Sequence, residues 1–453
     1  MQPFKSQKPT VSLTMIVKDE EVYLHDCLES VRDIVDEIVI VDTGSTDKTV
    51  EIAQRFGARI FHCAWHDDFA AARNECLKHA TGDWIFQIDA DERLPQESKT
   101  EIRKWLRNRS VTCVSVIIDS PKAEQKKGHI SRAHRLFRNL PGVKYTGRIH
   151  EQISPSVVAL GGREGQSAIH LVHLGYNKSE AEMRAKSERN YRLLKKQVEE
   201  EPENAYARFT FAQNLILNRK DEAAQAHLRR ALELGGLPKD IICSIHNNLA
   251  ELHMRKGAYE QAVSSAERAL AITKSQTTAY LLLHEIYGYL KDIPNQIRCL
   301  ESAIAVVEKS HRHGPTVSLE AYVDPAMLYL NLGRRYTDTE DSEAARNNYR
   351  KAFQISPDSP AVLTAFIDAL IQAGDSDEAC TVLATAPRTP ANLEKLAWFY
   401  IRRQEFGRAV STYEALLEHA PQNTDILKRL AALHQKLGHS HRAIDCLAQA
   451  RAS

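Results

Sequence analysis

Two carboxylates lie one residue apart where an apolar run of the sequence ends. They are Asp89 and Asp91 of the segment DADE, which overlaps the end of DWIFQID at 83–89. Carboxylate oxygens are ligands that Mg²⁺ prefers, and open α/β sheets bind their ligands at the carboxyl ends of the strands. An acidic pair also occurs in ordinary solvated turns. The interpretation as a metal site therefore depends on the surrounding sequence.

Two further acids stand at comparable places. Asp42 closes the apolar run EIVIVD at 37–42, where it is either a ligand-binding side chain or part of an Asx turn or helix cap in VDTGSTD. Glu151 lies in YTGRIHEQI at 145–153 and is a candidate general base, with a surface glutamate in a turn as the alternative. His150 beside it is either an acceptor contact or a structural hydrogen-bonding group.

Histidine and arginine candidates follow the acids. In SAIHLVHLGY at 167–176, His170 and His173 point to opposite faces of a strand, so only one of them can face the site. A lone strand histidine is often a satisfied core residue. Arg135 and Arg138 in HRLFRN have the geometry to hold phosphate, although a salt-bridged face is expected for at least one of them.

The apolar runs before residue 175 predict the sheet that positions these side chains. Short apolar runs alternate with amphipathic stretches, which is the pattern of parallel strands joined by helical crossovers. Ser45 or Thr46 is a candidate N-cap for the second helix. The expected strands are 11–17, 37–42, 58–62 and 83–89, then 111–118, 133–137 and 168–174, and the expected helices begin at Glu20, Ser45 and Phe69.

From residue 205 a repeat replaces the strands. Small residues recur at two fixed places in each unit, and the unit length of about 34 residues is that of tetratricopeptide repeats, in which paired helices approach closely. Seven units begin at Ala205, Cys243, Thr277, Ala326, Pro360, Pro390 and Thr424. The longer step before Ala326 predicts an inserted loop at 311–325. We expect a sheet domain at 1–177, a charged linker helix within 178–204 and the repeats at 205–453.

The order VSLTMIVKDEE, IVIVDTGSTDKT and NECLKHATGDWIFQIDADE resembles the family-2 glycosyltransferases with the GT-A fold. The resemblance implies a Rossmann-like nucleotide-sugar domain before an all-α repeat superhelix. It places the backbone near Val17 beside the base of a UDP-sugar and gives Asp42 a hydrogen bond to the uracil ring. Asp89 would approach the ribose or the metal, and Asp91 would ligate Mg²⁺ or Mn²⁺ at the diphosphate.

The resemblance extends to the acceptor side in a bacterial subset of the family. It implies that Glu151 is the general base of an inverting transfer. The wider resemblance to GT-A enzymes implies that His173 is a second metal ligand. Of the two arginines, Arg138 is expected to contact the nucleotide-sugar. A catalytic domain with repeats also resembles the sublancin-type peptide glycosyltransferases, which favours a peptide or protein acceptor. The alternatives are a glycan acceptor in envelope polysaccharide synthesis, a homodimer formed through the repeats, and a non-catalytic repeat scaffold.

Composition excludes several other classes. The net charge is +1, with 60 Lys and Arg against 59 Asp and Glu, so general nucleic-acid binding is not expected. No stretch has the roughly 18 apolar residues of a membrane span, and the N-terminus lacks the apolar core of a signal peptide. The cysteines are widely spaced, without a C-x-x-C pair. We therefore expect a cytoplasmic enzyme with reduced, mostly buried cysteines.

Overall fold

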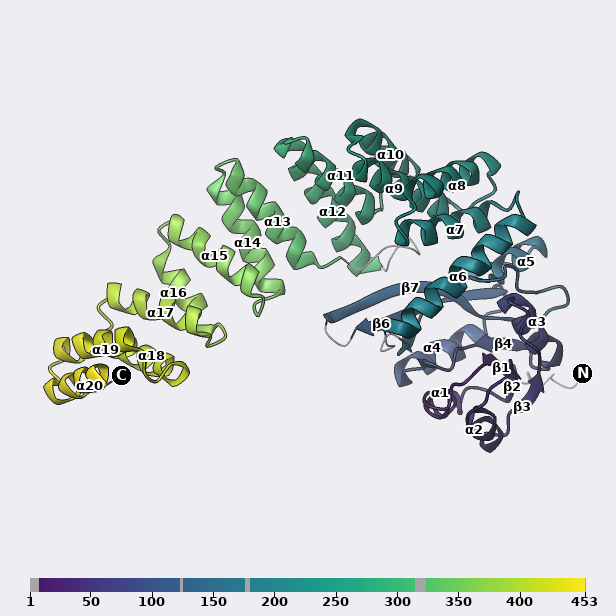
Figure 1. Ribbon diagram of the computed structural model, residues 1–453, viewed down its shortest axis with the longest axis horizontal. Coiled ribbons are helices and arrows are strands. Elements are labelled where there is room, and N and C mark those ends of the chain that lie inside the picture. The colour runs from purple at the N-terminus through teal and green to yellow at the C-terminus, as the bar shows by residue number, and fades with distance from the viewer. Residues whose placement is uncertain (1–7, 123–124, 176–179, 314–322, 453) are drawn as a thin grey trace, which may run out of the picture. The chain divides into compact units, whose positions relative to one another are not determined.

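The computed structural model describes residues 8–122, 125–175, 180–313 and 323–452. These residues fall into two compact units whose main division lies between Leu282 and Leu283. The first unit contains the sheet and the first repeats, and the second contains the later repeats (Figure 1). The cysteines are all free, and most of them are buried, as expected.

The described residues of the first unit form an eight-stranded mixed sheet with the strand order β3-β2-β1-β4-β7-β6-β8-β5. The strands are β1 Val11–Val17, β2 Glu37–Asp42, β3 Arg59–His62, β4 Trp84–Gln87, β5 Glu92–Arg93, β6 Cys113–Lys122, β7 Gln125–Arg138 and β8 Glu164–His173. The helices between them are α1 Leu24–Val31, α2 Thr49–Arg55, α3 Phe69–His79, α4 Gln96–Leu106 and α5 Ser154–Ala159.

The first four strands confirm the predicted parallel core. β1 pairs in parallel with β2 and β4, and β2 pairs in parallel with β3. Val17 therefore lies opposite Asp42, so the carboxyl ends of β1 and β2 meet at one edge of the sheet. The apolar faces of these strands and of the helices around them share one buried core.

The expected N-cap of the second helix is wrong. α2 begins at Thr49, and its N-cap, Lys48, makes no side-chain cap hydrogen bond. The Ser45 hydroxyl accepts a hydrogen bond from the backbone N–H of Asp19, and the backbone N–H of Thr46 donates to the Asp19 carboxylate. Ser45 and Thr46 therefore join the loop after β2 to the loop after β1, and they do not cap α2.

The later strands bring distant segments to the same edge. β7 is antiparallel to β4 and β6, β8 is parallel to β6, and the short β5 is antiparallel to β8. Glu92 consequently pairs with His173. In the β6–β7 ladder, Val114 lies opposite Leu136 whereas Ser115 lies opposite His134, so Arg135 is the extra residue of a β-bulge.

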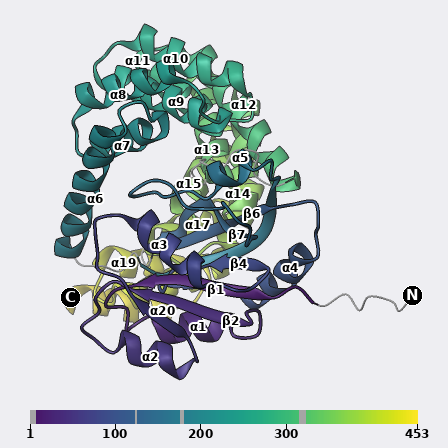
Figure 2. The ribbon, with the colours of Figure 1, turned by 90° about the vertical axis from the view of Figure 1, so that its right-hand side faces the viewer.

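A long helix, α6 Glu180–Glu200, leads from the sheet to the first repeat (Figure 1 and Figure 2). Its buried leucines, Leu193 and Leu194, share one apolar core with Ile149 of the loop before α5 and with Phe209 of the first repeat helix. The linker helix and the first repeats are therefore packed against the Glu151 loop within the same unit.

The repeat helices follow one another in hairpins, as predicted, and recurring small residues of the repeat, such as Ala262, Ala345 and Ala409, are buried between them. Their bounds are α7 Ala205–Leu217, α8 Asp221–Leu234, α9 Lys239–Arg255, α10 Tyr259–Ile272, α11 Thr277–Tyr289, α12 Ile293–His313, α13 Pro325–Asp338, α14 Ser342–Ile355, α15 Pro360–Gln372, α16 Ser376–Thr385, α17 Pro390–Arg402, α18 Phe406–His419, α19 Thr424–Lys436 and α20 Ser440–Ala452.

The insertion expected as a loop at 311–325 is helical in part. Its first residues continue α12, which is 21 residues long and ends at His313. Pro325 begins α13, and residues 314–322 lie outside the described residues. Among the helices that the structure describes, none combines the length and the apolar character needed to cross a membrane.

Candidate active site

The structure brings Asp91 and His173 together at the edge of the sheet. His173 Nε2 lies 3.2 Å from Asp91 Oδ2, and the backbone N–H of Leu174 donates to the Asp91 carbonyl at 2.8 Å. The hydrogen bond that His173 donates to the Asp91 carboxylate raises the pKa of His173. A methyl group at Gly175 would collide with the Asp91 carboxylate and would lie 2.9 Å from His173 Nε2. The absence of a side chain at Gly175 therefore allows the pair to form.

The Asp91–His173 pair is suited to bind a metal ion that a substrate also ligates. It offers one carboxylate and one imidazole, both partly exposed. No group of three or more His, Cys, Asp or Glu residues able to hold a metal occurs in the described part of the chain. Mg²⁺ often takes only one or two protein ligands and completes its shell with water and substrate phosphates. The donor set is thus suited to a divalent ion at a diphosphate and not to a closed protein cage.

Asp89 is held by two arginines. Its Oδ1 accepts from Arg73 Nη2, and its Oδ2 accepts from Arg135 Nη2, each at 2.9 Å. Burial alone would raise the pKa of Asp89, but the charges of Arg135 and Arg73 outweigh it and hold the pKa well below its usual range. Both oxygens are engaged within the protein, so the expected contact of Asp89 with ribose or metal stays a prediction.

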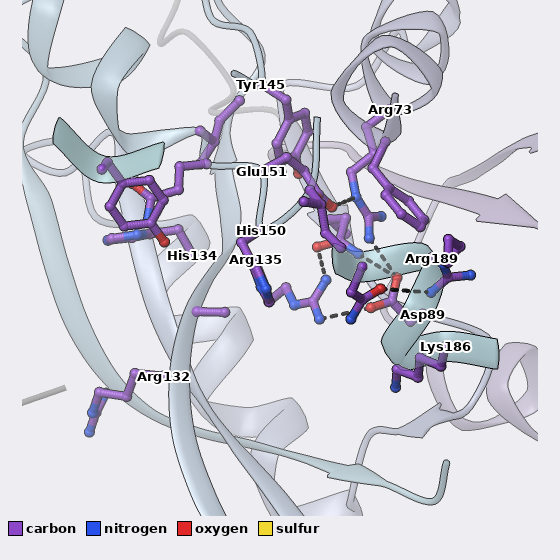
Figure 3. Close-up of a pocket in the computed structure, with 18 residues that line it drawn as sticks. Arg73, Asp89, Arg132, His134, Arg135, Tyr145, His150, Glu151, Lys186 and Arg189 are labelled. Carbon is purple, nitrogen blue, oxygen red and sulfur yellow. Dashed lines mark hydrogen bonds and ion pairs between the residues drawn. The ribbon is translucent and has the colours of Figure 1, made fainter. Parts of the chain in front are cut away.

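Arg73 links Asp89 to the general-base candidate. Its Nε donates to Glu151, whose side chain is 13% exposed, while its Nη2 contacts Asp89 (Figure 3). The loop that carries Glu151 turns through His150, which has a φ of 55°, in the left-handed region. Burial lowers the pKa of His150, so its imidazole is neutral at neutral pH. The structure thus joins the predicted donor acid and the predicted base through one guanidinium.

Arg73 was missed from the sequence, although a signal was present. Arg73 lies on the same face of α3 as Ala70 and Cys76, and all three are buried. A charged residue on the buried face of an amphipathic helix is rarely left without a partner. That position in FAAARNECLKHA could have indicated a buried ion pair.

Arg135, and not Arg138, reaches the site. Arg135 is buried and contacts both Asp89 and Glu92, so it serves an ion-pair network. Burial raises the pKa of Glu92 to about 7, against the opposing charge of Arg135. Arg138 pairs with Trp84 at the opposite end of β4 from Asp89. Its guanidinium lies over the Trp84 ring and donates to the backbone carbonyls at residues 108 and 111, so the structure does not bring it to the nucleotide-sugar site.

Asp42 and Val17 lie side by side, as predicted. The Val17 carbonyl accepts from the backbone and the hydroxyl of Thr43. Asp42 is 4% exposed, and its carboxylate accepts from the backbone N–H of Ser45 at 3.0 Å and lies 3.2 Å from His62 Nδ1. Burial would raise the pKa of Asp42, but the hydrogen bonds from Ser45 and His62 lower it overall. The carboxylate is therefore charged, and it also orders the 43–46 loop.

Two adjoining cavities contain most of these residues. The first, of about 580 Å³, is lined by Val17, Asp91 and His173, and the second, of about 480 Å³, is lined by Glu151. They share Phe69, Arg73, Asp89, Lys186 and Arg189. Helix α6 supplies Lys186 and Arg189, and Tyr206 of α7 lines the second cavity. The predicted linker and the first repeat thus line part of the site.

Comparison with known proteins agrees with this architecture. Residues 12–159 match the family described as Glycosyl transferase family 2, and residues 245–280, 336–397 and 393–427 match tetratricopeptide repeats. A TPR repeat-containing protein of Synechococcus elongatus is 36% identical over 266 residues, which are 57% of this chain and 66% of that protein. The SPbeta prophage-derived glycosyltransferase SunS of Bacillus subtilis is 34% identical over 231 residues, which are 50% of this chain and 54% of that protein.

A third relative is an uncharacterized glycosyltransferase of Rickettsia typhi, 37% identical over 92 residues, which are 20% of this chain and 31% of that protein. The chain covers less than two thirds of the length of each of these relatives. The similarity therefore supports an N-terminal glycosyl transferase family 2 region followed by tetratricopeptide repeats.

Proposed function

We propose that this chain, whose residues 12–159 form a glycosyl transferase family 2 region, transfers a sugar from a UDP-sugar to an acceptor with inversion at the sugar carbon. The observation that carries the proposal is the pairing of Asp91 with His173 beside a cavity whose neighbour contains Glu151. One cavity would bind the donor and the other the acceptor. We place the reaction in the cytoplasm.

Asp91 and His173 would hold Mg²⁺ or Mn²⁺ together with the donor diphosphate. Such an ion stabilises the negative charge that develops on a leaving diphosphate. Val17 and Asp42 would contact the base, because a buried charged carboxylate accepts a hydrogen bond from an imide N–H of uracil. Lys186 and Arg189 line both cavities and add positive charge where the diphosphate would lie.

Glu151 would take the proton of the acceptor nucleophile. Its hydrogen bond with Arg73 fixes the position of the carboxylate, and a general base must be held within reach of the proton that it takes. Because Arg73 also binds Asp89, a shift of Asp89 on donor binding would be transmitted to the base. Arg73 and Asp89 line both cavities, so a sugar bound in the donor cavity would lie close to Glu151.

A polypeptide acceptor is favoured over a glycan. Tetratricopeptide arrays commonly bind peptides, and here the first repeat helix contributes Tyr206 to the cavity that contains Glu151. An envelope glycan is the alternative acceptor, and dimerisation is an alternative use of the repeats. A non-catalytic scaffold is disfavoured, because such a protein has no need of the Asp91–His173 pair or of an ionised, buried Asp42.

The test is metal-dependent turnover of UDP-sugars by the purified chain and its Asp91→Asn variant. The donor can be found by the rise in melting temperature that a panel of nucleotide-sugars causes with Mn²⁺. We expect the variant to lose at least about 100-fold in turnover, because the loss of metal stabilisation costs several kcal/mol of transition-state energy.

Asp358→Asn, which changes an exposed aspartate in the second unit, is the matched control and should retain full turnover. Equal turnover by Asp91→Asn and the parent would remove the metal assignment. A lack of any nucleotide-sugar binding or turnover by the parent chain would refute the proposed activity itself.

A further inference from the structure

The cavity that contains Glu151 presents buried hydrogen-bond donors that have no partner. Among the described residues, these are Arg73 Nη1, Arg132 Nε, Arg135 Nε and Tyr145 Oη, and all four residues line the cavity. Arg73, Arg135 and Tyr145 are each at least nine-tenths buried. A buried donor without a partner is destabilising, so such groups are expected where a ligand supplies the missing acceptor.

The charges around the cavity favour a negatively charged ligand. Arg73 and Arg135 are balanced by carboxylates, but the Arg132 Nη1 contact is only a backbone carbonyl, that of Ser167, at 2.9 Å. Among the described residues, no carboxylate therefore neutralises the positive charge of Arg132. Burial lowers the pKa of His134 and His150, so these neighbours are neutral at neutral pH and do not share the charge.

One wall of the cavity consists of Arg132, His134 and Arg135 of β7, and the β-bulge explains how these side chains come to line the same cavity. Neighbouring strand residues normally point to opposite faces, yet Arg132, His134 and Arg135 of β7 all line the same cavity. The extra residue at Arg135 shifts the alternation, so Arg135 joins the face that already carries Arg132 and His134. Arg135 is used by the Asp89 and Glu92 pairs, which leaves Arg132 as the cation of β7 that can bind a ligand.

We propose that this cavity binds a peptide acceptor through an aspartate or glutamate close in sequence to the residue that receives the sugar. The carboxylate would contact Arg132, a backbone carbonyl of the peptide would accept from the hydroxyl of Tyr145, and the accepting side chain would reach Glu151. The acidic and the accepting residue must be close in sequence because one cavity of about 480 Å³ contains Arg132, Tyr145 and Glu151. This inference rests on the proposed function and names the substrate class of the same site.

Two features favour a peptide here over a free anion or a glycan. Tyr206 of the first repeat helix lines the cavity, so an extended chain bound there contacts the beginning of the repeat array. The wall also contains the rings of Phe69 and Tyr145, which suit the apolar parts of peptide side chains. An acidic peptide supplies both the oxyanion and this apolar surface.

The experiment uses the full chain, its best UDP-sugar and a library of nonapeptides with a central Ser, Thr or Cys. Each acidic peptide has a partner in which Asp or Glu is replaced by Asn or Gln. Mass spectrometry identifies the modified peptides, and kcat/KM is then measured for the matched pairs. We expect the acidic peptides to be favoured by about tenfold or more, because the amide partner peptides lose a charge-assisted hydrogen bond to the cavity.

Two variants connect this preference to the wall. Arg132→Gln should reduce the preference for acidic peptides about tenfold, chiefly through KM. Tyr145→Phe should also raise KM, and it should not lower the melting temperature, because the hydroxyl has no described partner in the free protein. UDP affinity, which depends on the neighbouring cavity, shows that each variant is folded. Arg109→Gln removes an exposed charge elsewhere and should match the parent in every measurement.

Three results would overturn the inference while leaving the proposed function intact. They are modification without a preference for acidic peptides, an unchanged preference in Arg132→Gln, and turnover of UDP-sugar with transfer only to glycans. If the parent chain neither binds nor turns over a nucleotide-sugar, the proposed function fails, and this inference fails with it.

Discussion

The guanidinium of Arg73 is shared by two carboxylates that belong to different halves of the site. It contacts Asp89, at the end of β4, and Glu151, in the loop before α5. Its position is fixed because the residue is buried and α3 is packed under the sheet. Removal of one partner from a buried ion pair typically costs 3–5 kcal/mol. Substitutions in this network therefore need to preserve hydrogen bonding if they are to report on chemistry.

Glu151→Gln meets that requirement. Glutamine can still accept from Arg73 Nε, but it cannot take a proton at neutral pH. We expect UDP affinity close to that of the parent and a loss of about 100-fold or more in transfer, which is the usual contribution of general-base catalysis. The measurements are calorimetric titration with UDP and single-turnover transfer. A fall in UDP affinity with unchanged transfer per bound donor would instead assign Glu151 to the donor site.

Asp42→Asn tests the contact with the base. The asparagine Oδ1 can still accept from the backbone N–H of Ser45, so the loop after β2 should keep its structure. The negative charge is lost, and UDP binding should weaken by about 1.5–3 kcal/mol. Calorimetry with UDP measures this, with the melting temperature as a check on the loop. Equal affinity for UDP would contradict the assignment of Asp42 to uracil.

The residues of the site were not equally predictable from the sequence. Asp42 and Asp89 each close an apolar run at a strand end, where parallel strands place their ligands, and Asp91 follows two residues after Asp89. The sequence of β7 does not show that a β-bulge shifts the alternation at Arg135, so it does not indicate that Arg135 reaches the site and Arg138 does not. A bulge depends on the pairing of two strands, so one strand's sequence does not reveal it.

At the scale of elements, strand periodicity predicted the parallel half of the sheet almost to the residue. β1 and β2 have the expected bounds because both are continuous apolar runs, as buried parallel strands are. The long hairpin of β6 and β7 and the two-residue β5 were not predicted in full. β5 is defined by its pairing with β8, a contact between distant segments, and its own sequence is too short to show a period.

The repeats depend on close packing of their helices, and Gly333 in α13 is an example. A Cβ at Gly333 would lie 2.6 Å from a ring atom of Tyr349 in α14, so the two helices approach at this point without room for a methyl group. We expect Gly333→Ala to lower the free energy of unfolding by about 1–3 kcal/mol, as overpacking does. Urea unfolding followed by circular dichroism measures the change.

Gly407→Ala is the matched control for that substitution. Gly407 lies in α18, and a Cβ there would meet open space. Alanine should therefore stabilise the helix by about 0.5–1 kcal/mol through its higher helix propensity. Opposite signs for the two variants would support tight packing at Gly333. Equal effects would show that α13 and α14 separate readily at this point.

At the scale of the whole molecule, the functional division need not follow the change in sequence periodicity. The repeat pattern begins at Ala205, yet α6 and α7 line the cavity of Glu151, and the compact unit that contains the sheet extends to Leu282. Periodicity reports which secondary structure a segment forms, and it carries no information on which neighbour that segment packs against. The boundary near residue 205 therefore remains a prediction about sequence pattern, while the site includes residues on both sides of it.

Two truncations test this division. A chain that ends after Thr273 keeps α6 to α10 and the apolar core that joins Ile149 to Leu193 and Phe209. We expect it to fold, to bind UDP like the full chain and to hydrolyse the donor.

A chain that ends after Pro202 loses Phe209 and the rest of α7, which exposes the buried face of α6 and removes Tyr206 from the cavity. Each fully buried large side chain contributes about 1.5–3 kcal/mol, so this second chain should melt at a markedly lower temperature and lose transfer. Circular dichroism melting, UDP titration and donor hydrolysis distinguish the two. If the chain ending after Pro202 were as stable and as active as the longer one, the first repeat would have no part in the site, and the acceptor would have to be bound by the sheet domain alone.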